Sequence, residues 1–380
     1  MKLFILQEKL KEGLRVIERI SPRSLTLPIL NTTLICAKKS FLNLAATDLE
    51  IGINWWTLAK IEQEGELAVP FSLLSNFFNL LPNKQVNIQK KENSLLIECG
   101  NYKTQIKGVS SEEFPIIPNV AKENFIEIEA APFCQGLEQI VDISSPSQTR
   151  PEISGIYFSF QKDAIKMVAT DSFRLGEKTL FLEERTAFSE TADKEISFIA
   201  PQKTVKEIIN IFSQKQGKLK IYFSPNQILF ESQMPETPHP EIQLVSRLID
   251  GEYPDYQEII PKKYETQIIS DRNEFLNQLK MAALFSGKIN EIKFKIDPKK
   301  AGIEFFSQNP DIGEHRSFLG GKIKGGPLEV SFNHRFLIAG LTSIKSSEVV
   351  FELNKEEGPA VLKPVGDSSY LYVAMPIKAS

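Results

Sequence analysis

Three aspartates stand at matching places in related stretches of the sequence. Repeated carboxylates of this kind could hold a divalent metal or serve in hydrolysis. Each aspartate, however, follows an apolar or alternating run and precedes a step that contains glycine, which is typical of a strand end and a turn. We therefore favour turn chemistry and keep repeated hydrolytic or metal sites at the first two as the alternative. The stretches are A-A-T-D-L-E-I-G with Asp48, A-T-D-S-F-R-L-G with Asp171, and the weaker Q-N-P-D-I-G-E with Asp311.

The motifs of common catalytic chemistry are missing from the sequence. It has neither a G-x-G-x-x-G nor a G-x-x-x-x-G-K-[ST] loop, and the glycine-rich segment 320–326 is interpreted as a turn between strands. The three histidines, His239, His315 and His334, do not have metal-ligand spacing, and Ser172 lacks a G-x-S-x-G elbow. The sequence predicts a protein that is not an enzyme, with no cofactor and no bound metal.

Composition describes a globular protein of more than one domain. The chain has 380 residues, of which 42% are hydrophobic and 24% charged, and its formal net charge is -3. A nucleic-acid role would therefore need local basic surface rather than bulk charge. Cys36, Cys99 and Cys134 form no C-x-x-C pair, which favours buried thiols in a reducing cytosol. We find no apolar signal segment or membrane span and expect a cytoplasmic protein.

The order of predicted elements repeats along the chain. Amphipathic helices are predicted at 7–20 (stopped by Ser21-Pro22), 71–81, 132–142, just after Pro201, 272–285 and 333–345, the last with Asn333 as N-cap. Strands are predicted around 65–70, 86–88, 95–98, 102–106, 125–129, 156–160, 165–168, 196–200, 292–296, 303–306, 328–332, 349–353 and 370–376. This indicates an α+β fold of three similar domains at 1–122, 123–250 and 251–380.

The six predicted helices are more basic than the rest of the chain. They carry ten Lys or Arg residues against seven Asp or Glu, a charge of +3 in a chain of net charge -3. Such a helix layer could face phosphate groups without reading bases. The other interpretation is an ordinary solvated surface.

Six ordered stretches give the sequence a resemblance to a known family. They are 27–30 (L-P-I-L), 46–50 (A-T-D-L-E), 149–151 (T-R-P), 169–175 (A-T-D-S-F-R-L), 253–256 (Y-P-D-Y) and 373–377 (V-A-M-P-I). Together they resemble the bacterial DNA polymerase III beta subunits, the beta sliding clamps. The resemblance implies a non-catalytic processivity factor: a head-to-tail homodimeric ring with helices inside and antiparallel sheets outside, which encircles double-stranded DNA independently of sequence. The implied partners are the clamp loader, the replicative polymerase, and repair and translesion polymerases.

The resemblance also implies three sets of functional residues. A pocket for short apolar partner peptides would consist of Ile153, Thr170, Ser172, Arg174, Leu175, Pro254, Ile259, Asn333, Phe336, Val373, Met375, Pro376 and Ile377. The candidates for facing DNA are Arg15, Arg19, Arg150, Lys203, Lys206, Lys280 and Arg335. The candidates for the dimer interface are Tyr102, Ile106 and Leu284.

Two departures from the family pattern fall near the implied pocket. Phe173 occupies a position where relatives often carry His or Tyr, and the chain continues past Ile377 as Lys378-Ala379-Ser380. Phe173 would alter the polarity of the pocket, and the tail, which ends less apolar than in some relatives, would change the outer contact of the pocket. The alternative to a ring is a three-domain interaction scaffold, which would be a stable monomer with exposed end strands.

Overall fold

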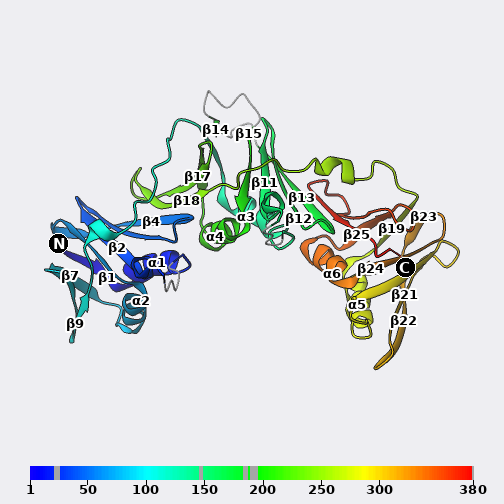
Figure 1. The fold of residues 1–380 in the computed structure, drawn as a ribbon, viewed down its shortest axis with the longest axis horizontal. Coiled ribbons are helices and arrows are strands. Elements are labelled where there is room, and N and C mark those ends of the chain that lie inside the picture. Colours follow the sequence, from blue (N-terminus) through cyan, green and yellow to red (C-terminus); the bar gives the residue numbers. More distant parts are fainter. Residues whose placement is uncertain (21–25, 145–148, 183–186, 189–195, 379–380) are drawn as a thin grey trace. The chain divides into compact units, whose positions relative to one another are not determined.

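The computed structural model describes all residues except 21–25, 145–148, 183–186, 189–195 and 379–380. The predicted helix stop at Ser21-Pro22 and the last two residues of the tail lie outside this part. The described residues form two compact units. The first contains Met1–Ala131, Lys206–Leu248 and the short strand β14, and the second contains the described parts of Pro132–Glu184, Lys194–Val205 and Ile249–Ser380 (Figure 1).

Two antiparallel sheets form the first unit. The five-stranded sheet has the order β5 (Lys60–Gln63), β1 (Lys2–Leu6), β7 (Gln85–Lys91), β8 (Ser94–Cys99) and β9 (Tyr102–Lys107). The nine-stranded sheet has the order β14 (Ala187–Phe188), β10 (Phe125–Glu129), β16 (Lys218–Phe223), β17 (Gln227–Gln233), β18 (Pro240–Arg247), β4 (Ile51–Leu58), β3 (Phe41–Thr47), β2 (Thr32–Lys38) and β6 (Gly65–Pro70). Strand β18 joins β4 although about 190 residues of sequence lie between them, with Leu244 opposite Ile53.

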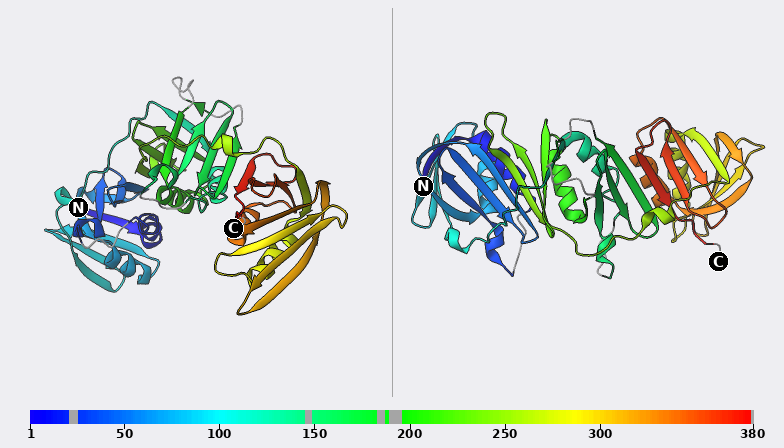
Figure 2. Two further views of the ribbon diagram at one scale, coloured as in Figure 1. Left: turned by 45° about the vertical axis from the view of Figure 1, so that its right-hand side comes forward. Right: turned by 90° about the horizontal axis from the view of Figure 1, so that it is seen from above.

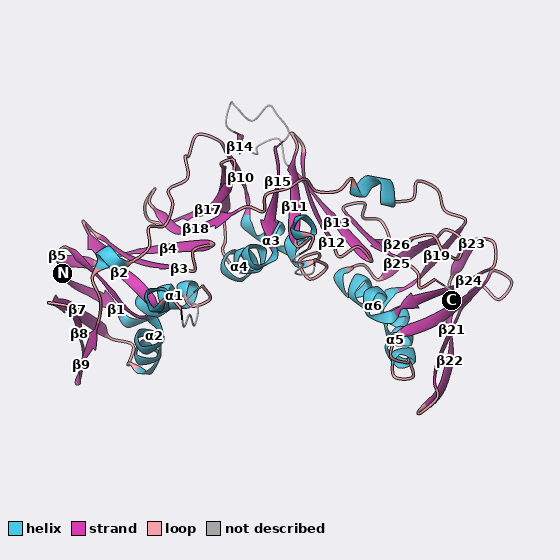
Figure 3. Cartoon of the chain, in the orientation of Figure 1, coloured by secondary structure: helices cyan, strands magenta, loops and turns pink. Residues whose placement is uncertain are grey.

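Helices α1 (Gln7–Ile17) and α2 (Phe71–Leu80) cover the sheets of the first unit side by side (Figure 3). Helix α1 buries Leu10, Leu14 and Ile17 at helical spacing, as the sequence predicts. Its close approach to β4 depends on Gly13, because a Cβ there would collide with Cε3 of Trp55. The core of this unit therefore lies between the helix pair and the sheets.

The second unit repeats this organisation. Its nine-stranded sheet has the order β15 (Ile196–Pro201), β11 (Gly155–Phe160), β12 (Ala164–Thr170), β13 (Arg174–Phe181), β27 (Tyr370–Ala374), β26 (Ala360–Pro364), β25 (Glu348–Leu353), β19 (Thr266–Asp271) and β23 (Lys322–Gly325) (Figure 2). Its four-stranded sheet has the order β22 (Gly313–Gly320), β21 (Gly302–Asn309), β20 (Glu291–Asp297) and β24 (Leu328–Asn333).

Helices α5 (Arg272–Ala283) and α6 (His334–Ser343) lie against each other in the second unit, and α3 (Ala130–Glu138) and α4 (Gln202–Phe212) complete the helices. Asp271 caps α5 by accepting from the Glu274 N–H at 2.8 Å. The predicted N-cap of α6 is confirmed, since Asn333 Oδ1 accepts from the Arg335 N–H at 3.0 Å. Short 3-10 turns occur at Pro28–Asn31, Ser111–Glu113, Pro151–Ile153 and Tyr256–Ile259.

Some predicted element boundaries were wrong. Helices expected at 7–20 and 132–142 end earlier, at Ile17 and Glu138. The prediction ran too far because the apolar spacing continues into buried turn residues such as Ile20 and Ile140. The segment 320–326 was predicted as a turn, but it contains strand β23, which pairs with β19. The helices as observed carry eight basic and five acidic residues, so their charge stays at +3.

Candidate functional site

The turn between β12 and β13 starts the candidate site in the second unit. Asp171 Oδ1 accepts from the N–H groups of Phe173 at 3.0 Å and Arg174 at 2.9 Å. Ser172 has φ of 76°, in the left-handed region. The first unit builds the same turn, with Asp48 Oδ1 accepting from Ile51 N–H at 2.7 Å and Leu49 at φ of 77°. The turn interpretation of these two aspartates is therefore confirmed.

Arg174 is held in place at the start of β13. Its Nε donates to Asp171 Oδ2 at 2.8 Å, and its Nη2 donates to the carbonyl of Asp142 at 3.0 Å. The guanidinium carbon lies 5.3 Å from the ring centroid of Phe336, within cation–π range. Because both neighbours fix the guanidinium, Arg174 offers a pre-positioned cation at this surface.

An aromatic pair stands beside Arg174. The rings of Phe173 and Phe336 are stacked, with centroids 6.3 Å apart and planes 20° apart. The Phe173 side chain is 61% exposed, so its ring offers an apolar surface that a partner could cover. Sequence reasoning had noted Phe173 only as a departure from the family pattern and had left it out of the pocket.

Strand pairing brings the distant pocket residues together. Arg174 lies opposite Ala374 and Leu175 opposite Val373 in the ladder of β13 and β27. Leu175 and Val373 share a buried cluster with Tyr256, whose hydroxyl donates to Glu177 Oε2 at 2.6 Å. This cluster forms an apolar floor, and Ile259 lies exposed at the end of the same 3-10 turn.

The segment after β27 continues along this surface. Met375 N–H donates to the carbonyl of Phe173, and Ile377 N–H donates to that of Ser331, both at 2.8 Å. Since Asn333 uses Oδ1 as a cap, only its Nδ2 group is left to donate to a ligand.

Most of the thirteen predicted pocket residues thus belong to one surface of the second unit. Four of them, Ile153, Thr170, Leu175 and Val373, are themselves buried and could only lie beneath a ligand, and Pro254 is half-buried in the segment that leads to Tyr256. Thr170 and Ser172 act within the turn: Thr170 Oγ1 donates to the Arg174 carbonyl at 2.8 Å and accepts from the Ser172 N–H at 3.2 Å.

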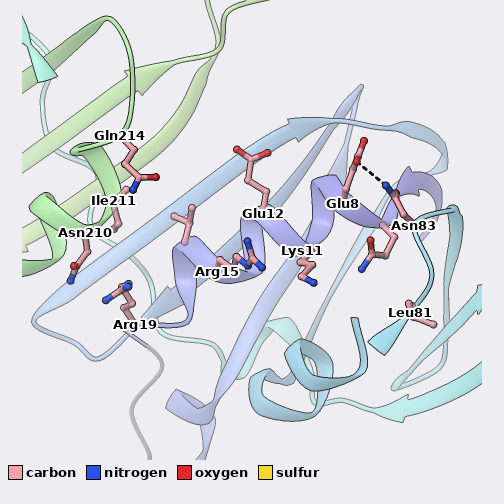
Figure 4. Close-up of a pocket in the computed structure, with 12 residues that line it drawn as sticks. Glu8, Lys11, Glu12, Arg15, Arg19, Leu81, Asn83, Asn210, Ile211 and Gln214 are labelled. Atoms are coloured by element: carbon pink, nitrogen blue, oxygen red, sulfur yellow. Dashed lines mark hydrogen bonds between the residues drawn. The ribbon is translucent and has the colours of Figure 1, made fainter. Parts of the chain in front are cut away.

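All seven basic residues predicted to face DNA have exposed side chains. Arg15 and Arg19 line a hollow of about 690 Å³ in the first unit, together with Lys11, Asn210 and Gln214 (Figure 4). Arg19 lies beyond the end of α1. Arg150 lies outside the helices, where it pairs with Glu152 at 3.2 Å and donates to Ser172 Oγ at 3.3 Å.

The three predicted interface residues differ in exposure. Tyr102 and Leu284 are exposed, whereas Ile106 is a buried core residue, so it could offer only its backbone to a partner. Strand β9, which carries Tyr102 and Ile106, pairs only with β8 among the described strands. It is one edge of the five-stranded sheet, whose other edge is β5, and β22 is one edge of the four-stranded sheet that packs on α5, whose other edge is β24.

Comparison with known proteins agrees with this architecture. The chain matches the N-terminal, central and C-terminal domains of the DNA polymerase III beta subunit at residues 1–118, 127–255 and 257–378. It is 27% identical over 384 residues to the beta sliding clamp of Synechococcus elongatus, covering 100% of this chain and 99% of that protein. It is 28% identical over 372 residues to the beta sliding clamp of Staphylococcus aureus, covering 95% of each.

Solved structures extend the comparison to the fold. The DNA polymerase sliding clamp of Bacillus subtilis has a TM-score of 0.92 at 24% identity, with 100% of both chains covered. The Pseudomonas aeruginosa clamp bound to griselimycin has a TM-score of 0.91 at 22% identity, again with full coverage.

The protein consists of three clamp domains with antiparallel sheets, which defines a DNA clamp. The chain belongs to the DNA polymerase III beta subunit family, the beta sliding clamps. It is a non-catalytic processivity factor, and the family implies DNA and a DNA polymerase as its partners. The described residues include no cluster of His, Cys, Asp or Glu fit for a metal ion, and no described helix could span a membrane.

Proposed function

We propose that two copies of this chain close head to tail into a ring that encircles double-stranded DNA and tethers the polymerase to it. The observation that carries the proposal is the pair of edge strands, β9 in the first unit and β22 in the second. If β9 of each copy pairs with β22 of the other, neither strand is left as an unpaired edge. The two-fold symmetry of the pair then closes the assembly. The topological link then holds the polymerase at a high effective concentration on the DNA.

The absolute mass in solution tests the ring. We expect a particle of twice the 42.9 kDa chain mass, with the scattering profile of a hollow ring. Small-angle scattering with light scattering measures both properties. A compact or extended monomer at micromolar concentration would instead support the interaction scaffold.

Domains at 1–122, 123–250 and 251–380 would supply six similar domains to this ring. The exposed basic residues Arg15, Arg19, Arg150, Lys203, Lys206, Lys280 and Arg335 would touch only phosphate groups. Contacts of this kind track any sequence and weaken as salt rises. Tyr102, the backbone at Ile106 and Leu284 would contribute to the closing interface.

The surface around Arg174 would bind short apolar peptides of the clamp loader and of the replicative, repair and translesion polymerases. Exposed Phe173 and the stack of Phe336 and Arg174 support this role, because they combine an apolar surface with a fixed donor. Met375 adds an adaptable thioether side chain.

We expect Arg174→Ala combined with Met375→Ala to weaken the binding of a polymerase peptide by about 2 kcal/mol or more, the range of interface hot spots. Isothermal titration calorimetry measures the loss. The matched control is Arg247→Ala. Arg247 is an exposed residue at the end of β18, which belongs to the nine-stranded sheet of the first unit. Unchanged affinity in the double variant would refute the assignment.

A further inference from the structure

The segment 250–263 carries two of the predicted pocket residues and packs on the nine-stranded sheet of the second unit. It contains the 3-10 turn Tyr256–Ile259. The hydrogen bonds of the turn itself are local, since the Gln257 N–H donates to Asp255 Oδ1 at 3.2 Å and the Ile260 N–H donates to the Gln257 carbonyl at 3.3 Å. These bonds shape the turn but do not attach it to the sheet.

One hydrogen bond attaches this segment to the sheet. Tyr256 Oη donates to Glu177 Oε2 at 2.6 Å, and among the described residues this is the only hydrogen bond between 250–263 and the rest of the chain. A carboxylate acceptor makes the bond stronger than one between two neutral groups. The bond is partly buried and Tyr256 is only 6% exposed, so little water competes for the hydroxyl.

Aromatic packing supports the segment without fixing the direction of its turn. Tyr253 stacks on Tyr157 of β11 with ring centroids 4.9 Å apart, and the Tyr256 ring lies 6.3 Å from Tyr157. Apolar contacts of this kind are non-directional, whereas a hydrogen bond prescribes a direction. The Glu177 carboxylate therefore fixes the orientation of the Tyr256 ring on the apolar floor.

Glu177 is itself held by the strand ladder. It follows Leu175 by two residues on β13, so the two side chains lie on the same face of the sheet. Its neighbours across the ladder are Val168 of β12 and Leu371 of β27, and both belong to the packing around Tyr256. The carboxylate thus has paired strands on both sides and offers a rigid point of attachment.

The turn transmits this position to Ile259. Side chains three residues apart lie above one another in a 3-10 helix, and Ile259 follows Tyr256 by three residues. Tyr256 is buried, whereas Ile259 is 44% exposed. A fixed Tyr256 ring therefore sets the direction of an exposed apolar side chain.

We propose that Glu177 is a positioning residue of the peptide surface around Arg174. It accepts the Tyr256 hydroxyl and thereby holds Ile259 as a preformed apolar wall for a short apolar peptide. This inference rests on the proposed peptide-binding function of that surface. Neither Glu177 nor Tyr256 is among the predicted pocket residues. A wall that is fixed before binding raises the affinity, because less order has to be imposed when the peptide binds.

Isothermal titration calorimetry on the full-length protein tests the inference. The probe is acetyl-Gln-Leu-Ala-Leu-Phe-amide, whose Gln side chain suits the Asn333 Nδ2 donor and whose apolar side chains suit the floor. We expect Tyr256→Phe and Glu177→Leu each to weaken binding about threefold to tenfold. Glu177→Gln keeps an acceptor oxygen and should stay within about twofold of the parent protein. The matched control is Tyr222→Phe, which removes a Tyr–Glu hydrogen bond of 3.2 Å in the first unit and should leave the affinity unchanged.

A double-mutant cycle shows whether the hydrogen bond acts through Ile259. In an Ile259→Ala protein, which lacks the wall, Tyr256→Phe should cause no further loss of affinity. A loss of full size in that protein would overturn the inference. Equal affinities of the parent, Tyr256→Phe and Glu177→Leu proteins would also overturn it, while the proposed peptide surface would stand. If the parent protein does not bind the probe, both the proposed surface and this inference are wrong.

Discussion

At the scale of single residues, Asp171 shows how one side chain sets both local structure and a surface. Its Oδ1 closes the turn while its Oδ2 orients Arg174, and Arg174 in turn lies over Phe336. A mostly buried pair with several hydrogen bonds is worth more than an exposed ion pair. The carboxylate that the sequence predicts as a turn residue therefore also positions Arg174, a residue of the proposed peptide surface.

His334 is a residue with a predictable response to pH. Burial, aided by the neighbouring charge of Arg335, lowers its pKa from the usual value, and its Nε2 lies 3.0 Å from Ser286 Oγ. Because the folded pKa lies below the unfolded value of about 6.5, the unfolded chain binds the proton first as pH falls. The stabilisation is complete above about pH 6.5 and is lost as pH falls through the folded pKa.

We therefore expect the free energy of unfolding to decrease between about pH 7 and pH 5, and His334→Gln to show a smaller decrease over this window. Urea unfolding followed by circular dichroism at several pH values measures both slopes. Equal slopes in the two proteins would contradict a buried neutral histidine at this site.

At the scale of elements, the helices have a net positive charge in a chain whose net charge is negative. Their net charge of +3 contrasts with -3 for the whole chain, and Lys203 and Arg335 are exposed on α4 and α6. If these helices face DNA, each lost cation reduces the number of counterions released on binding.

We expect Lys203→Glu with Arg335→Glu to slow loading onto circular DNA at low salt and to make loading less sensitive to salt, because fewer counterions are released and salt screens the repulsion between the new carboxylates and the phosphates. A loading assay across a salt series measures this effect. The matched control is Lys295→Glu with Lys322→Glu, which makes the same charge change on strands. Identical salt curves for all three proteins would show that α4 and α6 do not face DNA.

Local patterns predicted most elements, and they failed where the decisive contacts are distant. Helix starts were predicted closely because Pro70 and Asn333 mark them. Helix ends were not, because buried residues such as Ile140 keep the apolar spacing beyond the last turn. The pairing of β13 with β27 cannot be read from periodicity, since nearly 200 residues separate them. Only the family resemblance placed Arg174 beside Met375.

At the scale of the whole molecule, the proposed ring depends on its exposed ends. Leu284 follows α5 and is 71% exposed, which suits a residue that a second copy covers. A charge at such a buried contact would be left without a partner.

We expect Leu284→Arg to raise the dimer dissociation constant at least about tenfold, while Leu80→Arg leaves it unchanged. Leu80 is the matched control because it also ends a helix and is 84% exposed. Analytical ultracentrifugation over a dilution series compares the variants with the parent protein. Equal dissociation constants would remove Leu284 from the interface.

The late position of β27 has a consequence for synthesis. Strand β13 leaves the ribosome long before β27, the strand that completes its ladder and carries the chain on to Met375 and Ile377. Contacts between such distant segments form slowly and only after both have been made. A nascent or prematurely terminated chain can therefore fold its first unit while it still lacks the surface around Arg174. If that surface binds the polymerase as proposed, incomplete copies would not compete with finished chains for it.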